Sequence, residues 1–119
     1  MTAHARGISG RAGDVAALRG ARLDAVLDAM PDCVKVFDET ARLIYINRRG
    51  LGLMEAPDLA TLTGSGHAPV PPEYVSQCID VHARVMAGES VTWTYDVIGM
   101  KGARHHVEEE GRELLAQRS

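Results

Sequence analysis

Two short apolar runs separated by a polar turn constrain the fold of this chain more than any other feature of its sequence. The runs, Cys33–Phe37 and Leu43–Ile46, are rich in β-branched and aromatic residues, which suit a pleated sheet better than a helix. The joint between them is short and polar and opens on Asp38, so we expect an antiparallel hairpin. A lone hairpin is at best marginally stable in water, so the rest of the chain must cover it.

Alternation along a strand predicts which side chains share a face of the sheet. In the second strand of the hairpin, a regular alternation puts Leu43 and Tyr45 on one face and Ile44 and Ile46 on the other.

The composition indicates one soluble domain. The chain has 119 residues, of which 45% are hydrophobic and 24% charged, and it has room for one core only. A net charge of −3 does not favour a nucleic-acid partner, which usually meets a basic patch. No run of residues reaches the ~18 apolar positions of a membrane helix, and the first residues lack the apolar centre of a signal peptide. We therefore expect no nucleic-acid and no membrane partner.

The chain contains two cysteines, Cys33 and Cys78, far apart in the sequence and each in apolar surroundings. We interpret them as reduced thiols and expect a cytoplasmic protein.

The N-terminal part is expected to precede the fold. Residues 1–13 are rich in Gly, Ala and Arg and predict a flexible segment, and residues 14–30 predict one helix with Asp14 as its N-cap. The apolar arc of that helix is wide enough either to pack on its own sheet or also to pair with a second copy of the chain. In a homodimer, four apolar residues of this helix form the predicted interface: Val15, Leu18, Leu23 and Val26.

Short helices follow the hairpin. Asn47 suits the N-cap of a helix over residues 48–54, and residues 57–66 predict a one-turn helix or a loop.

The clearest helix spans residues 72–87, with Pro72 in its first turn and Gly88 just past its end. One wide apolar arc includes eight of its residues: Tyr74, Val75, Cys78, Ile79, Val81, His82, Val85 and Met86. Cys78 and His82 lie one turn apart near the middle of this arc.

The C-terminal part predicts strands. Val91–Ile98 alternates as a half-buried strand does, and residues 103–109 resume an extended run after a Gly-rich turn. Residues 110–119 predict either a further strand or a frayed helix.

This order of elements, and the residues that form them, resemble a PAS domain over residues 23–109. MPDCVKVFDETARLIYIN is similar to the opening hairpin of that family, and NRRGLGLM and APDLATLTG to its first short helices. PPEYVSQCIDVHARVMAGESVTWTYDVIGMKGARHHVE is similar to its long connecting helix and the next two strands. The resemblance implies an α+β fold over residues 31–119, with an antiparallel sheet of about five strands flanked by short helices and one long connecting helix.

PAS domains close their sheet with a last strand after a further turn, and only residues 110–119 could supply it here. The resemblance therefore leaves three alternatives: the tail supplies the strand, the chain is a fragment of a longer sensor, or a dimer covers an open sheet edge.

The resemblance also implies a pocket between the sheet and the helices. We expect seven residues to line it: Tyr45, Tyr74, Cys78, Ile79, His82, Met86 and Trp93. Haem-binding members of the family carry an axial His on the long helix, which makes His82 the haem candidate, although we favour a core histidine there. The Asn-Cys-Arg motif of flavin-binding members is absent, so we expect no flavin.

Other candidate sites have simpler interpretations. His105 and His106 point to opposite faces of a strand, so we expect no metal site. The run Glu108, Glu109, Glu110 predicts a solvated surface, and no arrangement of nucleophile, acid and base suggests an enzyme. We therefore expect a cytoplasmic sensory module that binds a small ligand and signals through dimer contacts to a downstream signalling protein or domain, as in two-component systems. The alternative is a ligand-free interaction and dimerisation module of a larger sensor kinase or regulator.

Overall fold

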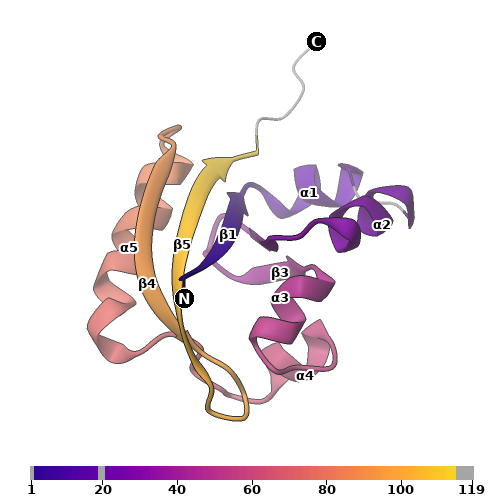
Figure 1. The fold of residues 1–119 in the computed structure, drawn as a ribbon. Coiled ribbons are helices and arrows are strands. Elements are labelled where there is room, and N and C mark those ends of the chain that lie inside the picture. The colour runs from indigo at the N-terminus through magenta and orange to yellow at the C-terminus, as the bar shows by residue number, and fades with distance from the viewer. Residues whose placement is uncertain (1, 19–20, 115–119) are drawn as a thin grey trace.

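The computed structural model describes residues 2–18 and 21–114 (Figure 1). Its elements, in chain order, are β1 (Thr2–Ser9), α1 (Ala12–Leu18), α2 (Ala21–Ala29), β2 (Cys33–Phe37), β3 (Leu43–Ile46), α3 (Arg48–Leu53), α4 (Leu59–Gly64), α5 (Pro72–Met86), β4 (Val91–Ile98) and β5 (Arg104–Glu113). Among these residues no helix is both long enough and apolar enough to span a bilayer.

Five strands form one sheet in the order β3-β2-β1-β5-β4, with helices packed on both faces (Figure 1). The predicted α+β class and the five strands are confirmed. The sheet is mixed, however, and not antiparallel throughout. The β2–β3 and β4–β5 pairs are antiparallel hairpins, whereas β1 runs parallel to both of its neighbours, β2 and β5.

The central strand is the segment for which the sequence predicted flexibility. Residues 1–13 were expected to be disordered, but Thr2–Ser9 pairs with β2 on one side and with β5 on the other. Its inward positions carry small residues, Ala5 and Gly7 among them, which gives the segment little apolar character. The backbone hydrogen bonds of a strand with two neighbours, rather than large apolar side chains, hold it in place.

The last strand of the sheet, which was expected from residues 110–119, is instead β1. β5 continues to Glu113, beyond the expected end at residue 109, and β1 lies beside it in the sheet. The edges of the sheet are β3 and β4. The rest of the tail, residues 115–119, lies outside the described residues.

The opening hairpin has the predicted bounds but an irregular register. The pairing shifts between Val36 and Phe37, so that Tyr45 faces Val36 and Leu43 faces Phe37. Because of this bulge Ile44 has no partner residue on β2, and the side chains of Ile44 and Tyr45 point to the same face of the sheet instead of alternating. The expected alternation is therefore wrong. Leu43 and Ile46 share one face, and Ile44 and Tyr45 pack with the other core cluster.

The N-terminal helical region contains two helices, α1 and α2, where one helix over 14–30 was predicted. α1 begins at Ala12, so Asp14 lies in its first turn and is not the N-cap. Val15 packs with Val36 and Tyr45 on one face of the sheet. Residues 19 and 20, between the two helices, lie outside the described residues.

Asn47 connects the hairpin, α2 and α3. It is fully buried, and its Oδ1 accepts from the backbone N–H groups of Val34 at 2.9 Å and Gly50 at 3.0 Å. Its Nδ2 donates to the carbonyl oxygens of Leu27 at 2.7 Å and Asp32 at 3.0 Å. The predicted N-cap is thus confirmed, and the same side chain also holds the end of α2 against the hairpin.

Candidate functional site

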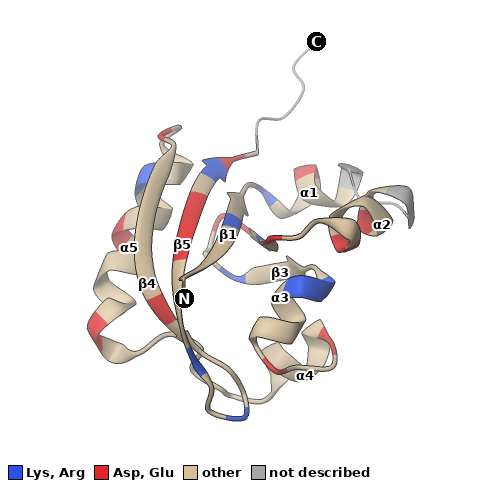
Figure 2. Cartoon of the chain, in the orientation of Figure 1, with Lys and Arg blue, Asp and Glu red and all other residues tan. Residues whose placement is uncertain are grey.

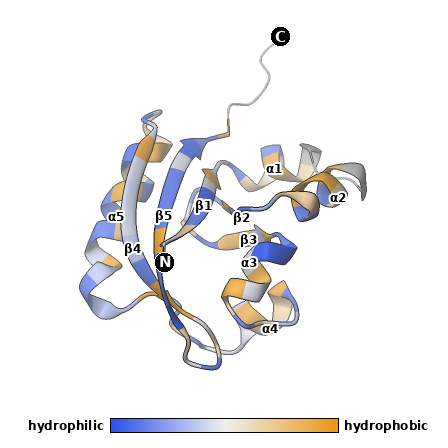
Figure 3. Ribbon diagram, in the orientation of Figure 1, coloured by the Kyte–Doolittle hydropathy of each residue, from blue (hydrophilic) through white to orange (hydrophobic). Residues whose placement is uncertain are grey.

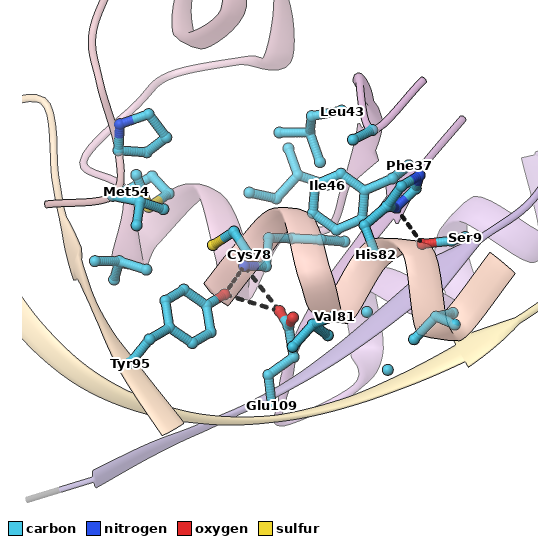
Figure 4. A pocket seen from close by; sticks show the side chains of 18 of the residues that line it. Ser9, Phe37, Leu43, Ile46, Met54, Cys78, Val81, His82, Tyr95 and Glu109 are labelled. Carbon is cyan, nitrogen blue, oxygen red and sulfur yellow. Dashed lines mark hydrogen bonds and ion pairs between the residues drawn. The ribbon is translucent and has the colours of Figure 1, made fainter. Parts of the chain in front are cut away.

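A cavity of about 400 Å³ lies between helices α4 and α5 and the face of the sheet that they cover, which we call the inner face. Its wall is mainly apolar and comes from all five strands, from α4 and α5, and from the loops beside them (Figure 4). The apolar residues of the wall include Phe37, Leu43, Ile46, Met54, Leu62, Val70, Val81, Val85, Trp93 and Val97. Gly7 and Ser9 bring β1 into the same wall, so the strand at the centre of the sheet is also part of the cavity.

Three polar side chains from different strands meet in this wall. Lys35 Nζ lies 2.9 Å from Glu109 Oε1 and donates to Tyr95 Oη at 2.5 Å. Tyr95 Oη in turn donates to Glu109 Oε1 at 3.0 Å, and Figure 4 shows the two side chains pointing toward each other. The Lys35 and Glu109 side chains are only 12% and 8% exposed, so this is a nearly buried ion pair. Because little water reaches these two groups, each charge is stabilised by the other and not by solvent.

Burial and charge pairing decide the ionisation of this cluster. Burial alone would lower the pKa of Lys35, but the Glu109 carboxylate and, after it, Tyr95 keep that pKa well above its ordinary value. Burial raises the pKa of Tyr95, and the neighbouring Lys35 ammonium opposes this only in part. Lys35 is therefore a cation and Tyr95 a neutral phenol near neutral pH.

Trp93 stacks on Tyr95 with ring centroids 4.1 Å apart and an angle of 8° between the planes. The side chain lines the cavity and is 8% exposed. Its indole Nε1 has no hydrogen-bond partner among the described residues. A buried donor without a partner is uncommon in a native protein.

His82 occupies another part of the cavity wall, where β1 ends. Its Nδ1 lies 3.4 Å from Ser9 Oγ (Figure 4), and its Nε2 lies 3.3 Å from the carbonyl oxygen of Glu39. Both ring nitrogens thus face protein oxygens, whereas an axial haem ligand must present one ring nitrogen to the iron. The residues present do not fit a haem held by His82, and the histidine instead links α5 to β1 and to the hairpin turn.

The two cysteines are free thiols with different surroundings. Cys33 is buried beneath α3, and Cys78 lines the cavity. Burial raises the pKa of both thiols, and Lys35 opposes this in part, so neither becomes a reactive thiolate at neutral pH.

The structure brings together three of the seven residues expected in the pocket. Cys78, His82 and Trp93 line the cavity. Tyr74 packs against the core cluster but is not part of the cavity wall, and neither is Met86.

The other two expected pocket residues, Tyr45 and Ile79, lie elsewhere. Tyr45 faces the opposite side of the sheet because of the bulge in the hairpin. Ile79 is 67% exposed, since the buried face of α5 is narrower than the apolar arc in its sequence. Val75, one turn before it, is exposed for the same reason.

Sequence reasoning missed the polar half of the site. Glu109 was assigned to a solvated acidic run, and Figure 2 shows that run along β5, but alternation in the strand turns Glu109 inward between Glu108 and Glu110. Lys35 likewise points to the inner face from β2, and its neighbours in the strand, Val34 and Val36, are buried. A charged residue at an inward position of each of two strands was the available signal, because such residues pair when buried.

The structure places the predicted dimer residues in different surroundings. Val15 is buried under the sheet and unavailable to a partner. Leu23 and Val26 are 37% and 61% exposed on α2, whose apolar residues are visible in Figure 3. The side chain of Leu18 lies outside the described residues.

Comparison with known proteins agrees with this architecture. A family model of the PAS fold matches residues 27–117, which is most of the chain. A search of curated proteins and a search of solved structures both give no match. The matched residues include both hairpins and all of α5, which form most of the cavity wall. On this evidence the chain belongs to the PAS-fold family, whose members are in general sensory and regulatory modules of signalling proteins.

Proposed function

We propose that this chain is a sensory module that binds a small molecule in the cavity between its sheet and α5 and passes the binding event to α1 and α2. The observation that carries this proposal is the cavity itself, with about 400 Å³ of space, a largely apolar wall and a few convergent polar groups. This combination is typical of small-molecule sites. A ligand-free interaction module would not need to keep such a space open, because an empty cavity reduces stability.

β1 supplies a physical route from the cavity to the N-terminal helices. Ser9, its last residue, contacts His82 in the cavity wall, and Gly10 donates its N–H to the carbonyl oxygen of Phe37 at 3.0 Å. α1 follows at once and packs Val15 beneath the sheet. A ligand that displaces Ser9 or His82 therefore changes the position from which α1 and α2 leave the sheet.

Cavity filling tests the proposal. Val81 lines the cavity, whereas Ile79, two residues away on α5, points to solvent. Val81→Phe places a ring in the cavity, and Ile79→Phe makes a similar change outside it. Native mass spectrometry of the protein purified from cells should show a small molecule on the wild type and on Ile79→Phe, and none on Val81→Phe.

A screen complements that experiment, because a ligand can be lost during purification. Small molecules that raise the melting temperature of the wild type and of Ile79→Phe, but not of Val81→Phe, support the proposal. Equal stabilisation of all three proteins, or no stabilisation by any compound, contradicts it and favours the ligand-free module.

The proposed output is a contact between α2 helices of two copies of the chain. Val26 is the more exposed of the two large apolar residues that α2 presents to solvent, and Leu23 lies one turn before it, so the two can form one apolar contact with a second copy of the chain. Val26→Glu should weaken self-association in sedimentation equilibrium at least tenfold. Ile79→Glu, an equal change on the exposed face of α5, should leave it unaltered. A monomeric wild type at high concentration would contradict the dimer.

A further inference from the structure

The wall of the cavity carries a pair of opposite charges whose head groups both lie among residues of the cavity. Lys35 Nζ lies 5.8 Å from the ring centre of Phe37 and 5.2 Å from that of Tyr95, and both rings line the cavity. The Glu109 carboxylate accepts from Tyr95 Oη at 3.0 Å, and Figure 4 shows both groups pointing from the sheet toward Cys78 on α5. Burial raises the pKa of the Cys78 thiol, which the Lys35 charge lowers and the Glu109 charge raises further, so both charges lie near this residue of the wall.

This pair retains hydrogen-bonding capacity of both kinds. Lys35 has three N–H groups but two partners among the described residues, Tyr95 Oη at 2.5 Å and Glu109 Oε1 at 2.9 Å. Both contacts of Glu109 are made at Oε1, and Oε2 accepts no hydrogen bond from the described residues. A Cβ atom at Gly7 would lie 3.1 Å from Oε2, so this oxygen lies over a residue of the wall that has no side chain. One oxygen atom of a ligand beside the pair can therefore accept from Lys35 and donate to Glu109.

Other polar side chains of the wall use their groups within the protein. His67 and His82 each place Nε2 against a backbone carbonyl oxygen, at 2.7 and 3.3 Å. The Thr63 hydroxyl donates to a backbone carbonyl oxygen at 3.0 Å. Burial keeps the Cys78 thiol protonated. The charge pair is therefore the polar anchor that the wall offers to a ligand.

The ligand that suits this anchor is uncharged. Lys35 and Glu109 pair at 2.9 Å, so their charges cancel. An additional ion would enter a mainly apolar space without a counterion of its own, which is unfavourable. An anion at Lys35 or a cation at Glu109 would also have to separate the pair and leave the other member buried and uncompensated.

We propose that the ligand is an uncharged, mainly apolar hydroxyl compound, an alcohol or a phenol, whose oxygen accepts a hydrogen bond from Lys35 Nζ and whose O–H donates to the Glu109 carboxylate. A hydroxyl group is the smallest neutral organic group that does both. The hydrocarbon part of the ligand lies against apolar residues of the wall such as Leu43, Ile46 and Val81. This inference rests on the proposed function, which makes the cavity the ligand site, and adds the chemical class of the ligand and the residues that select it.

The experiment compares five compounds built on one aromatic ring: p-cresol, p-methylanisole, p-xylene, p-toluate and p-methylbenzylamine. They present, in turn, a hydroxyl group, an acceptor without a donor, no polar group, an anion and a cation. In titration calorimetry of the whole protein at neutral pH, p-cresol should bind about tenfold more tightly than p-xylene, the gain expected from hydrogen bonds to charged groups. The ether should bind with an affinity between these two, and both ions should bind more weakly than p-cresol.

Nuclear magnetic resonance reports directly on the proposed anchor. The chain has two lysines, Lys35 and Lys101. Lys101 is exposed in the turn between β4 and β5, so its ammonium protons exchange rapidly with water, and the observable ammonium signal of the ¹⁵N-labelled protein belongs to Lys35. Lys101→Arg removes the other lysine and checks this assignment. Addition of p-cresol should shift the Lys35 signal, and addition of p-xylene should leave it nearly unchanged.

Two variants separate the pair from its neighbour. Lys35→Met combined with Glu109→Leu removes both proposed partners, whereas Tyr95→Phe removes the adjacent hydroxyl and keeps the pair. The ratio of the affinities for p-cresol and p-xylene should fall at least threefold in the double variant and stay near the wild-type value in Tyr95→Phe. Using the ratio cancels any general change of cavity shape. If the double variant fails to fold, the Lys35 signal of the wild type decides the question.

The outcomes separate the two proposals. Equal binding of p-cresol and p-xylene, tightest binding of an ion or of the ether, or an unmoved Lys35 signal overturns the inference while the cavity remains a ligand site. An unchanged ratio in the double variant overturns the role of the pair. Failure of all five compounds to bind also overturns the inference. The proposed function falls with it if Val81→Phe and Ile79→Phe show no difference in native mass spectrometry and in the ligand screen.

Discussion

Lys35 and Glu109, far apart in the sequence, form a 2.9 Å ion pair across the inner face of the sheet, one from β2 and one from β5. β1 separates these two strands, and in its register Gly7 pairs with Lys35, whereas Ala5 pairs with Glu109. A Cβ atom at Gly7 would approach the Glu109 carboxyl to 3.1 Å. The absence of a side chain at this position of the central strand therefore leaves room for the ion pair to form above it.

Breaking this ion pair should reduce stability strongly. Lys35→Met or Glu109→Gln leaves one buried polar partner uncompensated, and each should cost about 3 kcal/mol in urea unfolding. The double variant should lose less than the sum of the two, with a coupling of about 1–3 kcal/mol in the double-mutant cycle. Arg84 and Glu89, an exposed pair at 3.2 Å, are the matched control and should show almost no coupling. Additive losses for Lys35 and Glu109 would mean that the pair contributes nothing as a pair.

Replacing Asn47 should also be costly, because all four of its side-chain hydrogen bonds are made to the backbone. Asn47→Ala removes the N-cap of α3 and leaves other backbone groups unpaired, so unfolding in urea should show a loss of about 2–4 kcal/mol. Asn47→Asp keeps the acceptor but turns its second oxygen toward the carbonyls of Leu27 and Asp32, so it should be no better. Asp58→Ala, at the exposed cap of α4, should cost clearly less. A smaller loss at Asn47 than at Asp58 would contradict this account.

Proline in β1 should test the central strand directly. Ala5 is 4% exposed and pairs with Cys33 on one side and Glu109 on the other. Ala5→Pro removes its backbone N–H and should destabilise the fold by at least the ~3 kcal/mol that proline costs inside a helix. Arg11→Pro, placed just before α1, should be tolerated because proline suits a helix start. Circular dichroism melting of both variants gives the comparison, and a wild-type melting temperature for Ala5→Pro would rule out a paired β1.

Alkaline pH should unfold the protein partly through Tyr95. Burial raises the pKa of this phenol, so the folded chain holds its proton more tightly than the unfolded chain, whose value is near 10.0. Stability from Tyr95 is therefore complete below about pH 10 and falls as the pH rises above it. Lys35, whose pKa is also raised, loses stabilising charge in the same direction. Melting temperatures from pH 8 to 11 should fall less steeply for Tyr95→Phe than for the wild type, and equal slopes would exclude this role of Tyr95.

Local patterns in the sequence predicted the elements that carry large apolar side chains. The bounds of β2, β3 and β4 follow from β-branched runs that end in polar turns, and Pro72 and Gly88 mark the ends of α5. β1 was missed because small residues at its inward positions leave no hydrophobic pattern, and the family match, which begins at residue 27, does not include it.

The site was predicted only in part, for two physical reasons. The hairpin bulge depends on pairing between strands and cannot be read from alternation within one of them, so Tyr45 was placed on the wrong face. Glu109 gains its role from Lys35, a residue of another strand, and an acidic run by itself indicates solvent exposure.

The position of β1 also has a consequence for the order in which the chain assembles. Thr2 pairs with His106 and Ser9 with Glu113, so one flank of the central strand remains unpaired during synthesis until almost all of the domain has left the ribosome. Contacts between such distant residues close large loops, and chains rich in them fold slowly. Before β5 arrives, β1 presents a free strand edge that can capture another chain. Refolding of this small domain should therefore be rate-limited by docking of the β4–β5 hairpin onto β1, and aggregation should compete with folding at that step.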